Sequence, residues 1–302
     1  MPELPEVETI RRQLEPRIRG ARVERLEVLD PRWTRPAPPR EVEASVSGRT
    51  IETLRRRGKY LLLDLDGGST LVMHLRMTGN LLLIDEGDLV AAVDEEGFGP
   101  DDRSLRARFE LGDGRELRFN DARRFGEAFL IPTAGVDARF EGRLGIEPFS
   151  EQFTTEAIEA LAAGRRVPLK SFLLDQAGIA GVGNIYADEA LWRAELHPLS
   201  PAGSMRSEHA EALREGVIGA LDAGLAEGGA SIDDYLDSRG ERGSMQDEFL
   251  VHRREGEPCP RCDTEIRRIV VSGRSTYFCP GCQVRLRRRP RRKGRGRRTV
   301  SS

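Results

Sequence analysis

Apolar and polar residues alternate along much of the segment from residue 23 to residue 131, which is the period-two pattern of short strands. The alternating positions include Val42, Ala44 and Val46; Leu105, Ala107, Phe109 and Leu111; and Leu117 and Phe119. Gly67-Gly68 and Gly112-Asp113-Gly114 separate such runs in the way that hairpin turns do. The pattern predicts an antiparallel β-sandwich or barrel in this part of the chain.

A helical pattern precedes these strands. Val7, Ile10, Leu14 and Ile18 are spaced three and four residues apart, which places them on one face of a helix. Acidic residues suit its first turn, and Gly20 follows as a stop signal. We therefore expect one leading helix on the strand-rich domain.

After Pro148 the pattern changes to helical lengths, which predicts a second, all-helical domain. The candidate helices cover residues 155–163, 169–175, 184–194 and 207–226. Residues 178–183 separate two of them with three glycines among apolar residues, and we expect a tight turn with exposed backbone amides there. Gly228-Gly229 closes the last helix.

The charge distribution is asymmetric although the 302 residues carry a formal net charge of only -2. Residues 261–302 contain 14 Lys and Arg against two acids, whereas residues 85–102 contain eight acids and no base. A basic end suggests contact with a polyanion, and we expect the acidic segment to be a surface loop away from that contact. Residues 285–298 predict a disordered basic tail that adds nonspecific affinity, so deleting it should flatten the salt dependence of binding.

All four cysteines lie within one short segment. Cys259 and Cys262 form one C-x2-C pair, and Cys279 and Cys282 form a second, 16 residues further on. Four thiolates satisfy tetrahedral zinc, so the spacing predicts one structural Zn2+ with no open position. The residues between the pairs alternate like a hairpin with Gly273 at its turn, and Arg274 would project from the tip. The absence of cysteine elsewhere, of an apolar signal core and of an apolar run near the roughly 20 residues of a membrane span predicts a cytoplasmic protein with no membrane partner.

The first residues carry candidate chemistry. Once Met1 is removed, Pro2 would present a secondary amine beside the carboxylate of Glu3. An α-amino group titrates near neutrality, so part of it is a neutral nucleophile that can form an imine with an aldehyde-like carbon. An ordinary helix start explains the same residues, and both interpretations stay open at this point.

Other candidate residues also have two interpretations. Asn184 opens a predicted helix, where it suits the N-cap position, but the glycines before it and the nearby Lys170 would also suit an anion site. Lys59 at a strand start and His74 within an apolar strand are ordinarily a solvated charge and a half-buried ring. Met77 and Phe125 would ordinarily be core residues, and Arg123 part of a charged hairpin corner.

These signals together resemble one family, the bacterial formamidopyrimidine-DNA glycosylases. The resemblance is carried in order by Pro2-Glu3-Leu4-Pro5-Glu6-Val7-Glu8, Gly58-Lys59-Tyr60-Leu61, His74-Leu75-Arg76-Met77-Thr78-Gly79, Asp121-Ala122-Arg123-Arg124-Phe125-Gly126, Gly183-Asn184-Ile185-Tyr186-Ala187-Asp188-Glu189 and the block from Arg253 to Gln283. Collinear agreement over nearly the whole chain is far more specific than any single motif.

The resemblance implies an α+β multidomain fold: an N-terminal antiparallel β-sandwich with a leading helix, a helical helix-two-turn-helix domain and a C-terminal zinc β-hairpin. We expect these parts at residues 1–132, 151–248 and 249–284, with a linker at 133–150 and the basic tail at 285–302. The implied partner is double-stranded DNA with oxidised purine lesions or abasic sites, and we expect a monomer. The implied activity removes the damaged base and then cleaves the strand by β,δ-elimination.

The resemblance also implies residue roles. Pro2 resembles the nucleophile that forms the Schiff base and Glu3 its acid/base, while Glu6 organises the pocket. Other matching positions grip phosphates or fill the gap left by the extruded nucleotide. The former are Lys59, His74, Asn184 and Arg274, of which Lys59 and Arg274 are also expected to take part in catalysis, and the latter are Met77, Arg123 and Phe125. Lys170, beside Asn184 in the predicted anion site, is expected to bind DNA as well. The segment from Ser231 to Gln246 resembles the loop that closes over the oxidised purine.

The sequence departs from the family pattern at Ala122, where proline is usual, and at His252-Arg253, where Tyr-Gly is more typical. Two alternatives remain: an endonuclease VIII-like glycosylase for oxidised pyrimidines, and a catalytically inactive zinc-dependent DNA-binding protein. Leu4 and the Arg123-Arg124-Phe125 corner favour the purine enzyme over the first, and Pro2, Glu3 and Lys59 argue against the second.

Overall fold

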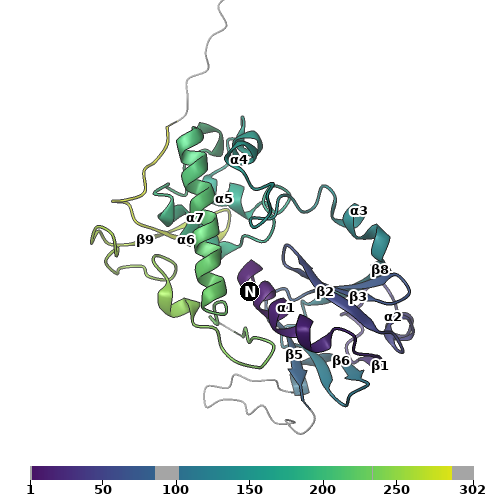
Figure 1. Cartoon of the computed structure of the whole chain (residues 1–302). Helices are drawn as coiled ribbons and strands as arrows, with labels where there is room; N and C mark the ends of the chain where they lie inside the picture. Colours follow the sequence, from purple (N-terminus) through teal and green to yellow (C-terminus); the bar gives the residue numbers. More distant parts are fainter. Residues whose placement is uncertain (1, 86–101, 233, 288–302) are drawn as a thin grey trace, which may run out of the picture.

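The computed structural model describes residues 2–85, 102–232 and 234–287. In it the strands that precede residue 133 gather on one side of the molecule and the helices α4 to α7 on the other, with the start of helix α1 between the two groups (Figure 1). Helix α1 (Leu4–Ile18) buries Val7, Ile10, Leu14 and Ile18 completely. The predicted leading helix is confirmed, and Gly20 follows it with a φ of 80°.

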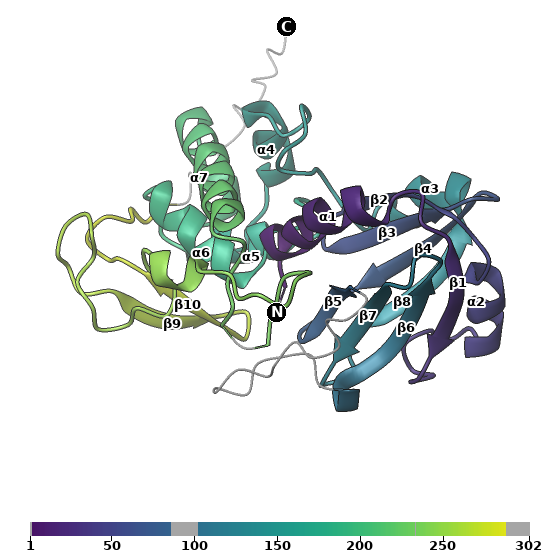
Figure 2. The same cartoon turned by 60° about the horizontal axis from the view of Figure 1, so that its bottom comes forward.

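Two four-stranded antiparallel sheets form the strand-rich part (Figure 2). The first has the order β1-β6-β7-β5 and the second the order β2-β3-β4-β8. Apolar side chains from both sheets and from α1 form one continuous core, so the predicted antiparallel sandwich is confirmed. The strands are β1 (Val23–Val28), β2 (Ile51–Arg57), β3 (Tyr60–Leu65), β4 (Ser69–His74), β5 (Gly79–Ile84), β6 (Leu105–Leu111), β7 (Glu116–Asp121) and β8 (Glu127–Pro132).

One predicted strand is wrong. Residues around Val42, Ala44 and Val46 form helix α2 (Pro39–Val46), not a strand. Val42 and Val46, four residues apart, are buried, whereas Ala44 points to solvent. Pro39 at the first helical position fixes a backbone angle that suits a helix start, and this local preference outweighs the apparent alternation.

The predicted helices of the second half are confirmed, and they pack around their own apolar core. They are α4 (Thr155–Ala162), α5 (Leu169–Leu174), α6 (Asn184–Arg193) and α7 (Ser207–Ala226), preceded by the short α3 (Val136–Phe140). Leu4 belongs to this core while the rest of the apolar face of α1 belongs to the sandwich core. Helix α1 therefore joins the two halves at its first turn.

The four-cysteine segment forms an antiparallel hairpin of β9 (Arg267–Val271) and β10 (Arg274–Phe278) beside α6 (Figure 2). Gly273 in its turn has a φ of 75°, as the predicted turn requires. Its small core includes Val251, Ile266 and Trp192 from α6. The hairpin is thus held against the helical region.

Two predictions lie almost entirely outside the described residues: the acidic surface loop between Asp85 and Asp102 and the basic tail after Arg285. Among the helices that the structure does describe, none combines the length and the apolar character that crossing a bilayer demands. The domain boundaries given above stay predictions.

Candidate active site

Pro2 and Glu3 are buried where the two halves of the molecule meet. The Leu4 N–H donates to the Gly181 carbonyl at 3.2 Å, which fixes the first residues against the turn before α6. The Glu3 carboxylate accepts hydrogen bonds from the N–H groups of Ile185 at 3.1 Å and Tyr186 at 3.4 Å. A residue of the N-terminal segment thus caps a helix of the other half, and the positive end of that helix holds the carboxylate in place.

This arrangement corrects the interpretation of Asn184 as an N-cap. Gly183 occupies the N-cap position, Asn184 is the first helical residue, and Glu3 supplies the capping oxygens. The Asn184 amide instead donates to the Ser275 carbonyl at 3.1 Å, across to the zinc hairpin. Its Oδ1 atom is buried and accepts no hydrogen bond from the residues that the structure describes. The anion-site interpretation of Asn184 stays a prediction.

The Glu6 side chain lies next to Pro2 and Glu3. Its carboxylate accepts hydrogen bonds from the Glu3 N–H at 2.7 Å, the Tyr186 hydroxyl at 2.6 Å and the Ala230 N–H at 2.8 Å. Burial, with the nearby Glu3 charge, raises the pKa of Glu6 above its ordinary value. Glu6 therefore ties α1, α6 and the segment after α7 together beside Pro2.

Lys59 lies in the two-residue turn between β2 and β3, after Gly58 with a φ of 57°. Its side chain is buried. Burial lowers the pKa of Lys59, although the carboxylates of Glu3 and Glu6 act in the opposite direction. A lysine near two carboxylates, with a weakened hold on its proton, suits proton transfer as well as phosphate binding.

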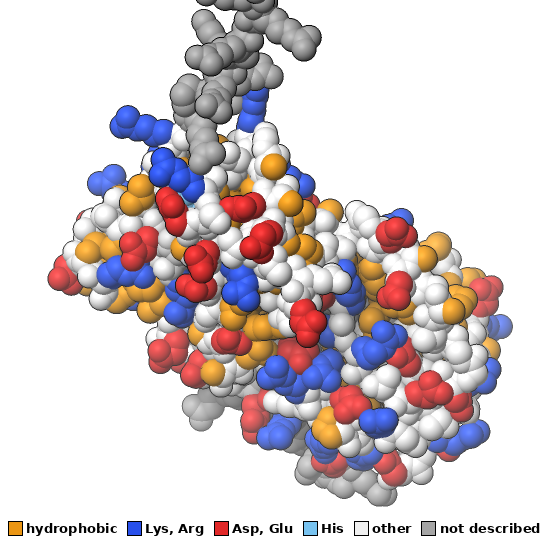
Figure 3. Space-filling model, turned by 45° about the horizontal axis from the view of Figure 1, so that its top comes forward, with side chains coloured by type: hydrophobic (Ala, Val, Ile, Leu, Met, Phe, Trp, Pro, Cys, Tyr) orange, Lys and Arg blue, Asp and Glu red, His pale blue; other side chains and the backbone are white. Residues whose placement is uncertain are grey.

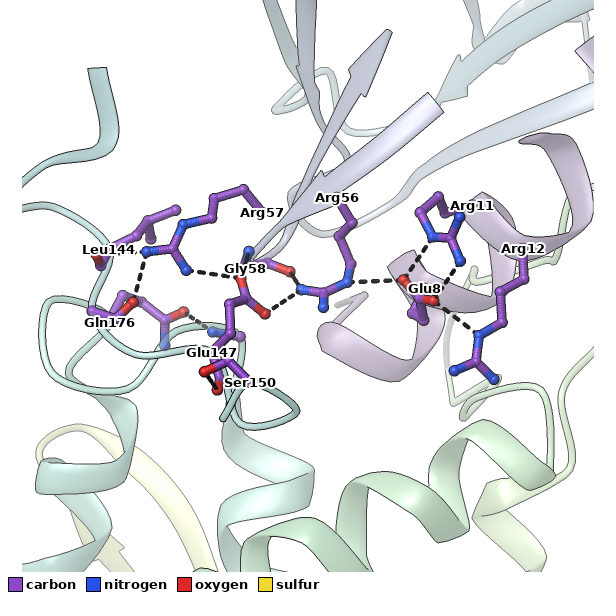
Figure 4. A network of polar contacts seen from close by, with 12 residues as sticks. Glu8, Arg11, Arg12, Arg56, Arg57, Gly58, Leu144, Glu147, Ser150 and Gln176 are labelled. Atoms are coloured by element: carbon purple, nitrogen blue, oxygen red, sulfur yellow. Dashed lines mark hydrogen bonds and ion pairs between the residues drawn. The ribbon is translucent and has the colours of Figure 1, made fainter. Parts of the chain in front are cut away.

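A network of ion pairs supports this turn from behind (Figure 4). Arg56 bridges Glu8 of α1 at 3.0 Å and Glu147 at 2.8 Å, and also donates to the Gly58 carbonyl. Glu147 in turn accepts from the Gly58 N–H at 2.5 Å and pairs with Arg57 at 3.0 Å. The turn that carries Lys59 is therefore fixed to the segment entering the helical half.

A pocket of about 310 Å³ opens beside these residues, and Lys59, His74, Gly183 and Arg274 are among the residues that line it. Four arginines contribute to its wall, which favours an anionic ligand. By contrast, acidic and basic side chains are interspersed over the face of the molecule seen in Figure 3. The arginines at the pocket are Arg76, Arg139, Arg143 and Arg274.

His74 is buried at the end of β4. Burial, together with the charges of Arg76 and Lys59, lowers the pKa of His74 to about 3. Its Nδ1 atom accepts the Arg76 N–H at 2.9 Å, which leaves the proton of the neutral ring on Nε2. His74 thus offers the pocket a neutral hydrogen-bond donor.

Lys170 and Arg274 differ in their exposure to solvent. Arg274 is exposed at the start of β10, as predicted from the hairpin. Lys170 has no exposed surface: its Nζ atom pairs with Asp188 at 2.6 Å and donates to the Asn184 carbonyl at 2.7 Å. The other Asp188 oxygen lies 2.8 Å from Nδ1 of His252. The structure therefore places Lys170 beneath the Asn184 backbone and not at the surface, because its charge is already paired.

The three residues predicted to fill the DNA stack lie in two neighbouring loops. Met77 is 38% exposed after β4, and Phe125 is 51% exposed between β7 and β8. The Arg123 guanidinium lies 5.0 Å from the centre of the Phe125 ring. Large apolar side chains presented singly at loop tips suit insertion between bases.

The sulfur atoms of Cys259, Cys262, Cys279 and Cys282 all lie within 4.8 Å of one another. Separations of 3.7, 3.5 and 3.1 Å between pairs of them are close to the roughly 3.8 Å that tetrahedral Zn–S bonds of about 2.3 Å would give. The Trp192 indole N–H also donates to the Cys259 sulfur at 3.3 Å. Four converging thiolates fit one structural zinc, which is the predicted cofactor.

Three residues of this site were missed by reasoning from the sequence. Tyr186 and Asp188 lie on α6 with their side chains buried under the site, and Gly183 provides the space for Glu3. The available signals were the glycine-rich stretch before α6 and the motif from Gly183 to Glu189, neither of which identifies a partner. Glu3 and Glu6 lie more than 150 residues away from this motif, and the Asp188 partners Lys170 and His252 lie 18 and 64 residues from it.

Family models match three successive parts of the chain. They are the formamidopyrimidine-DNA glycosylase N-terminal domain over residues 1–128, the formamidopyrimidine-DNA glycosylase H2TH domain over residues 144–235, and a zinc finger found in FPG and IleRS over residues 256–284. This combination of sandwich, helical region and zinc hairpin is that of a zinc-containing DNA glycosylase.

Full-length relatives agree. The chain is 43% identical over 287 residues to a formamidopyrimidine-DNA glycosylase of Chloroflexus aurantiacus, covering 95% of this chain and 99% of the relative. A second, from Chloroflexus aggregans, is 45% identical over 285 residues, with 94% and 99% covered. The chain belongs to the formamidopyrimidine-DNA glycosylase family.

Solved structures of the Lactococcus lactis Fpg have the same fold. A mutant bound to DNA containing Fapy-dG has a TM-score of 0.83 at 35% identity, covering 93% of this chain and 99% of that chain. A complex with DNA containing an abasic site has a TM-score of 0.83 at 34% identity, covering 94% and 100%. A third, with DNA containing an oxidised pyrimidine, has a TM-score of 0.82 at 35% identity, covering 93% and 99%.

Proposed function

We propose that this protein removes oxidised and ring-opened purines from duplex DNA and then cleaves the abasic strand through a Schiff base on Pro2. The observation that carries the proposal is the position of Pro2 and Glu3, buried together at the junction of the two halves, with the Glu3 carboxylate against Gly183, which lines a basic pocket. If these residues were only the start of a surface helix, the Glu3 carboxylate would not be expected to accept hydrogen bonds from the backbone of another helix.

The chemistry assigns distinct tasks to the two residues. After Met1 is removed, the Pro2 nitrogen attacks C1' of the damaged nucleotide, the bond from C1' to the base breaks, and the base leaves with a proton. Protonation of O4' then breaks the C1'–O4' bond, which opens the sugar ring and leaves an iminium between Pro2 and C1' that acidifies the C2' proton. Loss of that proton expels the 3' phosphate, and loss of the C4' proton then expels the 5' phosphate. Glu3 transfers the protons, and the amides of Ile185 and Tyr186 aim its carboxylate.

The remaining site residues are suited to binding an extruded nucleotide. Lys59, His74 and Arg274 line the pocket as two cations and one neutral donor, which matches phosphate oxygens. Asn184 orients the hairpin that bears Arg274 through its bond to Ser275. Met77, Arg123 and Phe125 occupy the space in the base stack, which offsets the few kcal/mol of unstacking.

Base preference is the part of the proposal that most needs a test, because a relative has been crystallised with an oxidised pyrimidine. We would compare single-turnover release of 8-oxoguanine and thymine glycol from otherwise identical duplexes. Faster release of 8-oxoguanine supports the purine assignment, and faster release of thymine glycol favours the endonuclease VIII-like alternative. Tight binding of both duplexes without base release or nicking would instead favour a catalytically inactive DNA-binding protein.

A further inference from the structure

The segment from Ala230 to Ser238, in which residue 233 lies outside the described part of the chain, follows α7 and contacts the sandwich half beside the proposed active site. The Ala230 N–H donates to Glu6, and the Tyr235 hydroxyl lies 3.3 Å from the Glu6 carbonyl. Tyr235 is 3% exposed and belongs to the sandwich core. Because this segment contacts Glu6 at its first residue and again at Tyr235, its position affects the wall behind Pro2 and Glu3.

Asn80, in β5, holds the middle of this segment with both atoms of its side-chain amide. Its Nδ2 donates to the Asp234 carbonyl at 2.8 Å, and its Oδ1 accepts the Leu236 N–H at 2.9 Å. The side chain is 6% exposed. Two hydrogen bonds from one buried amide to backbone groups two residues apart fix both the position and the direction of the segment.

The loop just before β5 carries Met77, one of the residues proposed to enter the DNA stack. Met77 precedes Asn80 by three residues, and the hydroxyl of the intervening Thr78 donates to the Asp121 carboxylate. Asp121 accepts the Gly126 N–H at 2.6 Å, and Thr78 Oγ1 accepts the Arg123 N–H at 3.2 Å. The loops that carry Met77 and Phe125 are therefore joined to each other and, through β5, to Asn80.

We propose that Asn80 is a positioning residue that couples insertion of Met77 into the DNA to the position of the segment Ala230–Ser238. This coupling favours excision of a base that must first be extruded from the duplex. The inference rests on the proposed function. A short path of hydrogen bonds and intervening backbone connects the two places, from the stack-filling loops through Asn80 and Tyr235 to Glu6. Movement of the Met77 loop on DNA would thus be transmitted to the pocket that receives the base.

The test uses two substrates that differ in the need for extrusion. A duplex with 8-oxoguanine opposite cytosine requires a base to leave the stack, whereas a duplex with a preformed abasic site has no base to move. For Asn80→Ala we expect about tenfold slower single-turnover base release, and nicking of the abasic duplex within about twofold of the parent protein. Asn80→Asp keeps the acceptor for Leu236 and should show a smaller loss of base release.

Gln13→Ala is the matched control. Gln13 of α1 holds the far end of the same segment, donating to Asp237 at 2.6 Å and accepting the Ser238 N–H at 3.0 Å, and these bonds do not involve the loop that carries Met77. We expect this variant to leave the ratio of the two rates unchanged. A ratio shifted as much as in Asn80→Ala would show that loosening the segment is sufficient, and would overturn the coupling.

Two further outcomes would overturn the proposal. Equal slowing of both substrates by Asn80→Ala and Asn80→Asp would indicate a purely structural role. Independent, multiplying effects of Asn80→Ala and Met77→Ala on base release would show that the two sites are not coupled, whereas we expect the double variant to be less impaired than that product. If the parent protein itself released no 8-oxoguanine, the proposed function would be at fault and not Asn80.

Discussion

Gly183 leaves the space in which the Glu3 carboxylate sits, and Gly183→Ala should therefore remove most of the base-release activity. A Cβ atom at this position would lie 2.1 Å from Cδ of Glu3 and 2.4 Å from each of its carboxylate oxygens. The backbone there has φ -122° and ψ -161°, which alanine adopts without strain. The effect of the substitution is therefore steric and local to Glu3.

The size of the effect follows from the displacement. Ordinary contact with a Cβ begins near 3.4 Å, so the carboxylate must retreat by about 1 Å, and a misplacement of that size costs roughly 100-fold in rate, or about 2.7 kcal/mol. Loss of the cap on α6 should also lower the free energy of unfolding by about 1 kcal/mol. Folding and DNA binding should otherwise persist, because Lys59, Arg274 and the zinc hairpin are not touched.

The assay is single-turnover release of 8-oxoguanine, with binding to a duplex that holds a stable abasic analogue measured in parallel. Gly178→Ala is the matched control in the same turn, since its Cβ would meet nothing closer than the Asp175 carbonyl at 3.4 Å. An unchanged rate in Gly183→Ala would refute the role of the Glu3 position. An equal loss in Gly178→Ala would show that the turn as a whole is responsible.

Three further predictions concern charge and metal. The pKa of His74 is about 3 in the folded protein, so the unfolded chain binds more protons below pH 6.5 and the free energy of unfolding falls as the pH falls. In urea unfolding, His74→Asn should avoid about 2 kcal/mol of that loss between pH 7 and pH 5, and a pH dependence identical to that of the parent protein would contradict this. Asp188→Asn leaves Lys170 buried without its charge partner and should cost about 3–5 kcal/mol in the same assay, whereas a cost below about 1 kcal/mol would mean that the pair is not needed. Metal analysis should find one zinc per chain bound by Cys259, Cys262, Cys279 and Cys282, and chelation should weaken DNA binding by about tenfold or more; full affinity without zinc would remove the hairpin from the interface.

Local patterns predicted the elements whose periodicity is regular. The spacing of Val7, Ile10 and Leu14 gave α1, and the spacing of the cysteines gave the zinc site. The alternation of Val42, Ala44 and Val46 misled because three apolar residues fit a strand or, without the middle one, a helix. Pro39 at the first helical position and the packing of Val42 and Val46 in the sandwich core decide between those possibilities.

The sequence pattern does not reveal which residues are brought into contact only by folding. The cap on α6 comes from Glu3, 182 residues before Ile185, so the helix appeared to need Asn184 for that purpose. Lys170 was expected to contribute to an anion site, because nothing in the sequence pattern reveals that Asp188 pairs with it in the interior. Nothing in the sequence around Asn80 indicates its bonds to residues more than 150 positions away.

The central claim is that the Pro2 nitrogen forms a covalent imine with the damaged nucleotide. It is tested most directly by borohydride trapping on a duplex with 8-oxoguanine opposite cytosine, comparing protein with a free Pro2 terminus and protein that keeps an N-terminal tag. The account predicts a covalent adduct that maps to Pro2 by mass spectrometry and is absent from the tagged protein. Tight binding with no adduct, or an adduct mapped to Lys59 or another residue, would contradict it.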